Sequence, residues 1–338
     1  MKMLSVTVPC YNSQDYMRKC VDSLLKGGDQ MEIIIVDDGS TDNTGVIADD
    51  YAAKFPDNVR VVHQPNGGHG EGINAGLKIA TGKYFRVVDS DDWLDESALK
   101  SLLAAMNDAE AVGGADMFVT NYVYTHTDGS KDNVIDYRRE FRYGKATNWQ
   151  QTRKFGLSNY LTLHSATFRT EVVRKSGVVL PKHVFYEDNY FVYCCLKHVD
   201  TLRYLDVDLY RYYIGRQGQS VQSDVFAQRY NQQIEMCLLT FTRYNLADEI
   251  RLNKKRGKCL YHNCRMMFAI AVAGARLNGS NEAERNCEQM WTKAIECDGY
   301  YGKKLRYRTP IALQMFPGKS GRHFANFLYK CTRRIVKN

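Results

Sequence analysis

The sequence predicts an α/β protein with a mostly parallel sheet flanked by helices and a C-terminal helical extension. Three observations support this. Short apolar, β-branched runs alternate with helical segments through the first third of the chain. Polar clusters end three of those runs. From Phe226 onward the pattern is helical throughout. Repeated strand-helix units of this size imply parallel strands joined by right-handed crossovers.

The first third contains four expected strands, at residues 4–8, 33–36, 59–62 and 84–88. The run 33–36 is unbroken and β-branched, as in a strand buried on both faces. Helices are expected between the strands: one capped by Asn12 or Ser13, one capped by Thr41 or Asp42, and two more at 70–80 and 96–109.

The middle of the chain changes character. Strands are expected at 115–125, 161–169 and 201–213, with a hairpin turn at Asp128-Gly129. Residues 185–191 open a helix between the last two strands. Further helices are expected at 226–246, 250–277 and 282–297. We therefore divide the chain into 1–115, 116–225 and 226–338.

Composition limits the class of protein. The net charge is +8, and no acidic residue follows Asp298, so the basic character belongs to the tail. The longest apolar run, 266–275, is half the ~20 residues that a membrane span needs. The ten cysteines lack zinc-site spacing. We expect a cytoplasmic protein with reduced, mostly buried thiols, and no nucleic-acid-reading motif accompanies its basic tail.

An acidic cluster ends the fourth expected strand. Asp89, Asp91 and Asp92 lie within four positions, where core packing requires no carboxylate. Like charges this close repel, and a divalent cation bound to a phosphate would relieve the repulsion. The alternative is a solvated acidic turn that caps the helix after Asp95. Asp92 in particular is expected to position Asp91 or to cap that helix.

Two other strand ends carry polar clusters, at residues 9–12 and 37–40. In doubly wound sheets, ligands bind outside the carboxyl ends of the strands, where the strand order reverses. The coincidence of three such clusters predicts one shared ligand site.

Six segments in this order and spacing resemble the family 2 glycosyltransferases of the GT-A fold. They are Val8-Pro9-Cys10-Tyr11-Asn12, Val36-Asp37-Asp38-Gly39-Ser40-Thr41-Asp42, Asn66-Gly67-Gly68 with Gly72-Ile73-Asn74-Ala75-Gly76, Thr81-Gly82-Lys83-Tyr84, Asp89-Ser90-Asp91-Asp92, and Glu187-Asp188. The resemblance covers about residues 1–215. It implies transfer of a hexosyl or N-acetylhexosaminyl group from a nucleotide diphosphate donor, commonly a UDP-sugar, with inversion at the anomeric carbon.

The resemblance also implies roles for single residues. Asp38 would bind the uracil edge, and Asp91 with Asp89 would hold Mn²⁺ or Mg²⁺ on the diphosphate. The other residues expected to bind the nucleotide sugar are Pro9, Tyr11, Asn66, Gly72, Asn74, Arg211 and Arg216. Two alternatives stay open: Tyr11 as a core aromatic, and the glycines as a device for close helix-sheet packing.

The expected base is Asp188, which would take the proton of the acceptor hydroxyl. Glu187 precedes it, and only one of two adjacent carboxylates should act as base. The alternative for the pair is a favourable interaction of acids with a helix N-terminus. Arg211 and Arg216, with Ser220, match a loop that closes over the diphosphate in similar family members.

The acceptor is expected to be a glycan or a lipid-linked molecule in polysaccharide biosynthesis. The chain lacks the Gln-x-x-Arg-Trp signature of processive synthases, which favours addition of one residue at a time. The resemblance assigns 1–115 to nucleotide-sugar binding and 116–225 to the acceptor and the base. Residues 226–338, a helical region with a basic tail, carry no motif of the family. Alternatives are a non-catalytic nucleotide-sugar-binding subunit and a nucleotidyltransferase.

Residues 322–337 place apolar side chains at helical spacing among five basic ones. A basic amphipathic helix is typical of binding to an anionic membrane surface. The alternative is a helix packed on the domain with a solvated basic face.

Overall fold

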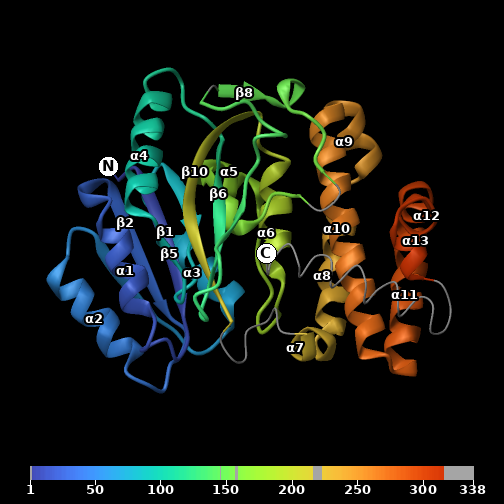
Figure 1. Cartoon of the computed structure of the whole chain (residues 1–338), viewed down its shortest axis with the longest axis horizontal. Helices are drawn as coiled ribbons and strands as arrows, with labels where there is room; N and C mark the ends of the chain where they lie inside the picture. Colours follow the sequence, from blue (N-terminus) through green and yellow to red (C-terminus); the bar gives the residue numbers. More distant parts are fainter. Residues whose placement is uncertain (1, 145, 157–158, 216–222, 316–338) are drawn as a thin grey trace. The chain divides into compact units, whose positions relative to one another are not determined.

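The computed structural model describes residues 2–144, 146–156, 159–215 and 223–315 (Figure 1). They form two compact units. Unit 1 comprises residues up to 154 together with 161–184 and 198–214, and it contains all the described strands. Unit 2 comprises 155–160, 185–197 and the described chain from 215 onward, and its regular structure is helical.

The strands of unit 1 form one mixed sheet in the order β3-β2-β1-β4-β9-β6-β10-β5, with β7 paired to β6 and β8 to β10. Their bounds are β1 Leu4–Cys10, β2 Met31–Asp37, β3 Val59–His63, β4 Tyr84–Val87, β5 Trp93–Leu94, β6 Met117–His126, β7 Asn133–Ile135, β8 Ala146–Asn148, β9 Ala166–Arg169 and β10 Thr201–Ile214.

The four strands predicted in the first third pair in parallel, as expected. β1 is the centre of this half: Val6 lies opposite Ile33 of β2 on one side and Arg86 of β4 on the other. The chain moves outward from β1 to β3 and then returns to the other side of β1 as β4. The strand order therefore reverses between β1 and β4, which is where a ligand site is expected.

The second half of the sheet departs from a purely parallel arrangement. β9 runs antiparallel to both neighbours, β4 and β6, and β7 pairs with β6 through the predicted hairpin at Asp128-Gly129. The strand predicted at 161–169 is confirmed only over Ala166–Arg169. Its first part is a 3₁₀ turn, η3 (Leu163–Ser165), because Thr162 and Ser165 form a capping box around that turn.

Helices cover the sheet of unit 1 (Figure 1). The longer ones are α1 Met17–Leu25, α2 Thr44–Lys54, α3 His69–Ile79, α4 Glu96–Glu110 and α5 Thr170–Ser176, and 3₁₀ turns occur at η1 Gly28–Gln30 and η2 Trp149–Gln151. The prediction that Asn12 or Ser13 caps α1 is wrong. The helix begins only at Met17, because both side chains are engaged elsewhere, as described below.

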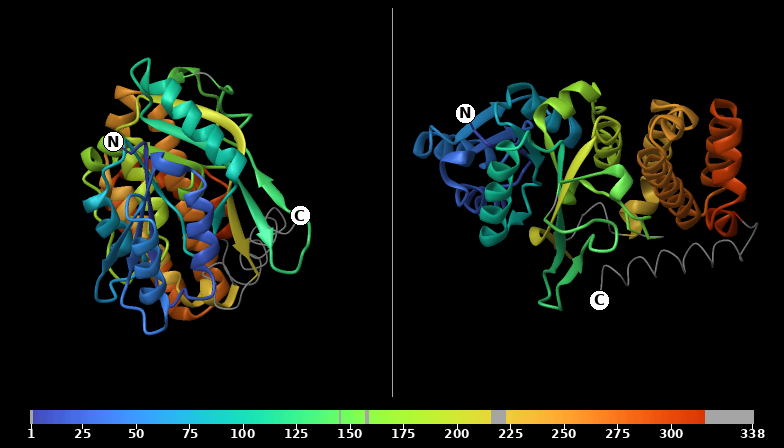
Figure 2. Two further views of the ribbon diagram at one scale, coloured as in Figure 1. Left: turned by 90° about the vertical axis from the view of Figure 1, so that its left-hand side faces the viewer. Right: turned by 90° about the horizontal axis from the view of Figure 1, so that it is seen from above.

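The helices of unit 2 pack side by side (Figure 2). They are α6 Glu187–Leu196, α7 Ser223–Gln228, α8 Tyr230–Arg243, α9 Leu246–Leu252, α10 Lys254–Asn278, α11 Asn281–Cys297, α12 Gly299–Tyr307 and α13 Ile311–Gln314. Phe268 of α10 packs against Phe241 and stacks on Trp291, and all three are buried. The helix predicted over 250–277 is interrupted at Asn253, whose side chain accepts from the Arg256 amide and starts α10 anew.

Two predictions about the tail and the thiols have different outcomes. The basic helix expected at 322–337 lies outside the described residues. Within the described part, no helix has both the length and the apolar character required to cross a membrane. The nine cysteines described there are thiols rather than disulfides, and all but Cys297 are buried.

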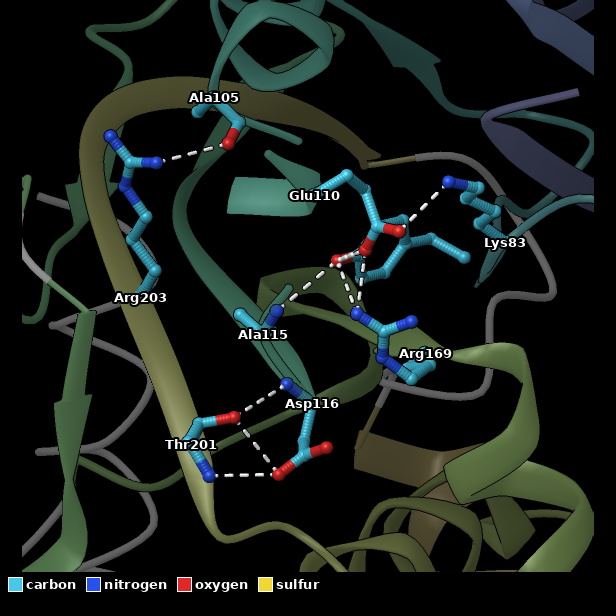
Figure 3. Close-up of polar contacts among 9 residues, drawn as sticks. Lys83, Ala105, Glu110, Ala115, Asp116, Arg169, Thr201 and Arg203 are labelled. Carbon is cyan, nitrogen blue, oxygen red and sulfur yellow. Dashed lines mark hydrogen bonds and ion pairs between the residues drawn. The ribbon is translucent and has the colours of Figure 1, made fainter. Parts of the chain in front are cut away.

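An ionic network joins the starts of several strands in unit 1 (Figure 3). Glu110, the last residue of α4, accepts from Lys83 at 2.9 Å, from the Tyr84 hydroxyl at 2.8 Å and from Arg169 at 2.6 Å. Nearby, Asp116 accepts from the amide and hydroxyl of Thr201 at the start of β10. Burial opposes ionisation of Glu110, but the hydrogen bonds from Lys83, Tyr84 and Arg169 outweigh burial and hold the pKa of Glu110 at about 2.

This network predicts an acid-dependent contribution to stability. Because the pKa of Glu110 is lowered on folding, its stabilisation is present above the unfolded-state value near 4.5 and is lost as pH falls towards 2. We expect Glu110→Gln to reduce the free energy of unfolding by about 2 kcal/mol at pH 7. Denaturant unfolding at pH 7 and pH 3 checks this, and the difference between variant and wild type should shrink at pH 3.

Candidate functional site

The loops after β1 and β2 are fastened to each other by side chains. Asn12 takes a positive φ of 48°, receives the Thr41 amide on its side-chain oxygen at 2.9 Å, and donates its own amide to the Ser40 hydroxyl at 3.0 Å. The Ser13 amide donates to the Thr44 hydroxyl at 2.7 Å. The Ser13 hydroxyl donates to the Tyr11 carbonyl and is also hydrogen-bonded to Ser90, so neither residue has its side chain available to cap α1.

The loop after β4 joins the same group. The hydroxyls of Ser13 and Ser90 are hydrogen-bonded at 2.8 Å across the point where the strand order reverses. The structure therefore brings together the three polar clusters at the ends of β1, β2 and β4. Tyr11, between the first two, is 53% exposed. A largely exposed ring is not a core aromatic, so that alternative is wrong.

Asp38 is buried and organises the turn before α3. Its carboxylate accepts from the Gln64 side chain at 2.7 Å and from the amides of Gly67 and Gly68 at 2.9 and 2.7 Å. Asn66 donates to the Asp38 carbonyl at 3.0 Å. An ionised carboxylate offers about four acceptor positions. Asp38 therefore keeps capacity for one further donor, which is what its predicted task with a base N–H requires.

Helix α3 packs closely on β1 because of its glycines. A Cβ on Gly72 would meet Cβ of Pro9 at 2.9 Å, and one on Gly76 would overlap Thr7. The alternative that these glycines permit close packing of the helix on the sheet is therefore confirmed. Asn74 pins the segment after α5, since its side chain donates to the Leu180 carbonyl at 2.9 Å and accepts from the Leu180 amide at 3.0 Å. The predicted part of Gly72 and Asn74 in donor binding stays a prediction.

Asp89 is held by a histidine. His69, the first residue of α3, contacts its carboxylate at 2.9 Å, and the imidazole of His164 lies 4.0 Å from its other oxygen. Burial opposes ionisation of Asp89, but the hydrogen bond from His69 and the charge of that imidazole outweigh it. The pKa of Asp89 is therefore below its usual value, and the carboxylate is ionised at neutral pH.

Asp92 is fully buried, and its surroundings disfavour the ionised form, unlike those of Asp89. Its carboxylate accepts from the Tyr210 hydroxyl at 2.6 Å and from the Tyr213 amide at 2.8 Å, both on β10. Burial, followed by repulsion from Asp89, raises the pKa of Asp92 well above its usual range. The prediction that Asp92 caps the next helix is wrong, because Asp95 does so by accepting from the Ala98 amide.

Asp89, Asp92 and His164 form a group that fits a metal ion. One ligand atom from each lies within 4.8 Å of the others, comparable with twice the ~2.1 Å Mg²⁺–oxygen bond. Burial lowers the pKa of His164 to about 4, so the imidazole is neutral, as a metal ligand must be. A cation here would also relieve the repulsion between the two carboxylates. Asp91 is half-buried on the same turn, and its predicted role as ligand stays a prediction.

The two arginines expected at the diphosphate have different outcomes. Arg211 of β10 contacts Asp132 at 3.2 Å and Asp95 at 3.8 Å, so its guanidinium is paired with acids in this structure. Its role towards a phosphate is untested. Arg216, with Ser220, lies outside the described residues.

Glu187 and Asp188 belong to unit 2 and open α6. Glu187 is buried, whereas Asp188 is half-buried and accepts from the Asn189 side chain at 3.1 Å. The residue before them, Tyr186, takes φ 71°, a left-handed conformation that is unusual for a tyrosine. Its ring packs on Phe226 and thereby helps to fix that conformation. Strained residues of this kind cluster at functional sites, which is compatible with the predicted base.

Sequence reasoning missed two members of the site, His164 as a candidate metal ligand and Tyr210. His164 is stacked on Tyr212 at 4.6 Å between ring centroids, edge-to-face with Tyr210 at 4.9 Å and tilted against Tyr122 at 5.5 Å. A signal existed in the alternating tyrosines of β6 and β10, which place aromatic rings on one face of adjacent strands. Nothing in the sequence indicated that a histidine of η3 would join them.

Comparison with known proteins gives a family match. The family model described as glycosyl transferase family 2 matches residues 5–175. The glycosyltransferase GlyG of Streptococcus pneumoniae is 42% identical over 133 residues, which are 38% of this chain and 42% of that protein. The match therefore spans less than half of this relative.

Two solved structures share the fold. S. aureus TarS residues 1–349, in complex with UDP-GlcNAc, has a TM-score of 0.68 and 20% identity, and the match covers 99% of this chain and 92% of that one. The mannosyltransferase PcManGT of Pyrobaculum calidifontis, in complex with GDP-Man and Mn²⁺, has a TM-score of 0.52 and 14% identity, covering 98% and 86%. At these identities the likeness establishes the GT-A arrangement of the α/β fold.

Proposed function

This chain belongs to glycosyl transferase family 2, and from that membership we propose that it is a non-processive, inverting, metal-dependent glycosyltransferase that uses a nucleotide-diphosphate sugar. The observation that carries the proposal is the meeting of three motif loops at the reversal of strand order, with Asp38 on one side and the Asp89–Asp92–His164 group on the other. A UDP-sugar is the donor we favour, because a UDP-sugar occupies a protein of this fold.

The donor would lie across the ends of β1, β2 and β4. Asp38 accepts an N–H of the base, and the exposed Tyr11 ring stacks on it beside Pro9. Asn66 keeps the Asp38 loop in place, while Gly72 and Asn74 bring α3 and its amino end close to the ribose and diphosphate. Arg211 and Arg216 supply positive charge to the phosphates once Arg211 leaves its acidic partners.

The divalent cation would be Mn²⁺ or Mg²⁺. Asp89 and Asp91 would hold it, together with Asp92 and His164. When bound, it supplies Lewis-acid stabilisation of the departing diphosphate. A protein of this fold binds GDP-Man with Mn²⁺. The lowered pKa of Asp89 and the neutral imidazole of His164 keep both ligand-ready at neutral pH.

Asp188 is the base we propose for single displacement. It accepts the proton of the acceptor hydroxyl while that oxygen attacks the anomeric carbon, and the bond to the diphosphate breaks on the opposite face. Glu187 is too enclosed to meet an acceptor, so we assign it a supporting role. We keep the functional division at 1–115 for the donor, 116–225 for acceptor and base, and 226–338 for the helical region.

The acceptor class follows from analogy alone: a glycan or lipid-linked hydroxyl in polysaccharide biosynthesis, with the enzyme in the cytoplasm and its basic tail on an anionic membrane. The second candidate is a non-catalytic nucleotide-sugar-binding subunit. It keeps the donor site and has no need of Asp188.

One experiment separates these readings. Purified protein is incubated with a panel of UDP- and GDP-sugars, Mn²⁺ and simple glycan acceptors, and released nucleoside diphosphate and product configuration are followed by NMR. We expect nucleoside diphosphate release and a product of inverted anomeric configuration. A retained configuration would contradict the single displacement, and donor binding without any turnover would favour the non-catalytic subunit.

A further inference from the structure

Arg86 is a buried cation that the proposed chemistry does not use. It lies on β4 and is 1% exposed. Among the described residues its guanidinium pairs with no carboxylate: one nitrogen donates to the Thr167 hydroxyl at 2.7 Å, another donates to the His164 carbonyl, and Nε has no hydrogen-bond partner. Burial lowers the pKa of Arg86, but only to about 10, so the charge persists at neutral pH.

An uncompensated charge in the core is strongly destabilising. Nothing in the packing of β4 requires an arginine, since Tyr84 and Val88, which lie on the same face of the strand, are uncharged and buried. A methionine or leucine would fill much of the same volume without that cost. We therefore explain Arg86 by the groups that its guanidinium contacts, and not by a contribution to the stability of the fold.

Arg86 contacts the residues that support the candidate metal group. Through the His164 carbonyl it fixes the 3₁₀ turn that presents the imidazole. Its guanidinium also lies 5.6 Å from the centroid of the Tyr210 ring. The hydroxyl of that ring donates to Asp92 and accepts from the Asp89 amide at 3.2 Å. One planar group thus contacts the supports of all three members of the Asp89–Asp92–His164 group.

We propose that Arg86 is a positioning residue for the divalent cation, holding His164 and Tyr210 so that the imidazole and the Asp92 carboxylate converge on one point. The proposal rests on the metal requirement in the proposed function. It requires the fork of the guanidinium and not merely its charge, because a lysine ammonium cannot reach Thr167, the His164 carbonyl and the ring face together.

The test measures Mn²⁺ affinity in the presence of UDP, by the loss of the free-ion EPR signal, together with denaturant unfolding. We expect Arg86→Lys and Arg86→Met each to weaken Mn²⁺ binding at least tenfold. Glu110→Gln is the matched control, because it weakens the same unit at the other end of the strands and should leave Mn²⁺ affinity within twofold. In a His164→Gln background the Arg86→Met loss should be smaller than in the wild-type background, since part of the effect of Arg86 acts through the His164 ligand.

Wild-type Mn²⁺ affinity in folded Arg86→Lys and Arg86→Met, or fully additive losses with His164→Gln, would overturn the proposal while leaving the proposed function intact. If wild type itself bound no Mn²⁺, the metal requirement and the role of Arg86 would fail together. If Arg86→Met shows no cooperative unfolding transition, that variant does not fold. Mn²⁺ affinity is then measured in Thr167→Val instead. This substitution removes one hydrogen bond of the guanidinium, and an unchanged Mn²⁺ affinity there would also contradict the proposal.

Discussion

Asp188→Asn is expected to lower kcat by 10²–10⁴-fold while changing the affinity for the nucleotide sugar less than twofold. The substitution keeps size and polarity but removes the ability to accept the acceptor proton, and general-base catalysis contributes an effect of this size. Steady-state kinetics with saturating acceptor gives kcat, and calorimetric titration of the nucleotide sugar gives its affinity.

Glu187→Gln is the neighbouring control. Glu187 is buried at the start of the same helix, so its substitution should act mainly on stability and lower kcat by less than tenfold. Undiminished turnover in Asp188→Asn would refute the base assignment. A larger loss in Glu187→Gln than in Asp188→Asn would transfer the role to Glu187.

Removal of the metal is expected to have the second large effect. Chelation should reduce the transfer rate at least 10³-fold, because the departing diphosphate then leaves without charge neutralisation. Asp89→Asn should reproduce most of this loss in the presence of Mn²⁺. His69→Leu removes the hydrogen bond to Asp89 but no proposed ligand, so it should cost less than Asp89→Asn and be rescued by higher Mn²⁺.

The measurement for this prediction is the rate of nucleoside diphosphate release across a Mn²⁺ titration of wild type and both variants. If Asp89→Asn kept the wild-type rate and Mn²⁺ dependence, the cation would not bind where we place it. Activity that survives exhaustive chelation would contradict the metal requirement altogether.

Much of the parallel half of the sheet could be predicted from the sequence because its signals are local. The run at 33–36 is buried on both faces, and core packing does not require the three carboxylates of Asp89, Asp91 and Asp92 at a strand end. Parallel pairing then brings the ends of β1, β2 and β4 to the same edge. The Ser13–Ser90 hydrogen bond joins residues 77 positions apart, and its existence follows from that topology.

The other half could not be predicted because its determinants are distant in sequence. A short apolar run such as 166–169 does not reveal its direction, so the antiparallel β9 was not expected. His164 and Tyr210 reach the acidic turn only after β9 and β10 have paired with the rest of the sheet. Arg86 was visible as the one charge in an apolar strand, but its partners Thr167 and His164 were not.

The three strand ends are expected to form one donor site that a cation completes. Calorimetric titration of UDP with and without Mn²⁺, in wild type and in Asp38→Asn and Asp89→Asn, tests it most directly. We expect UDP to bind wild type at least tenfold more tightly with Mn²⁺, Asp89→Asn to lose that enhancement, and Asp38→Asn to bind weakly with or without the cation. Equal UDP affinity with Mn²⁺ and with chelator, unchanged by either substitution, would contradict the account.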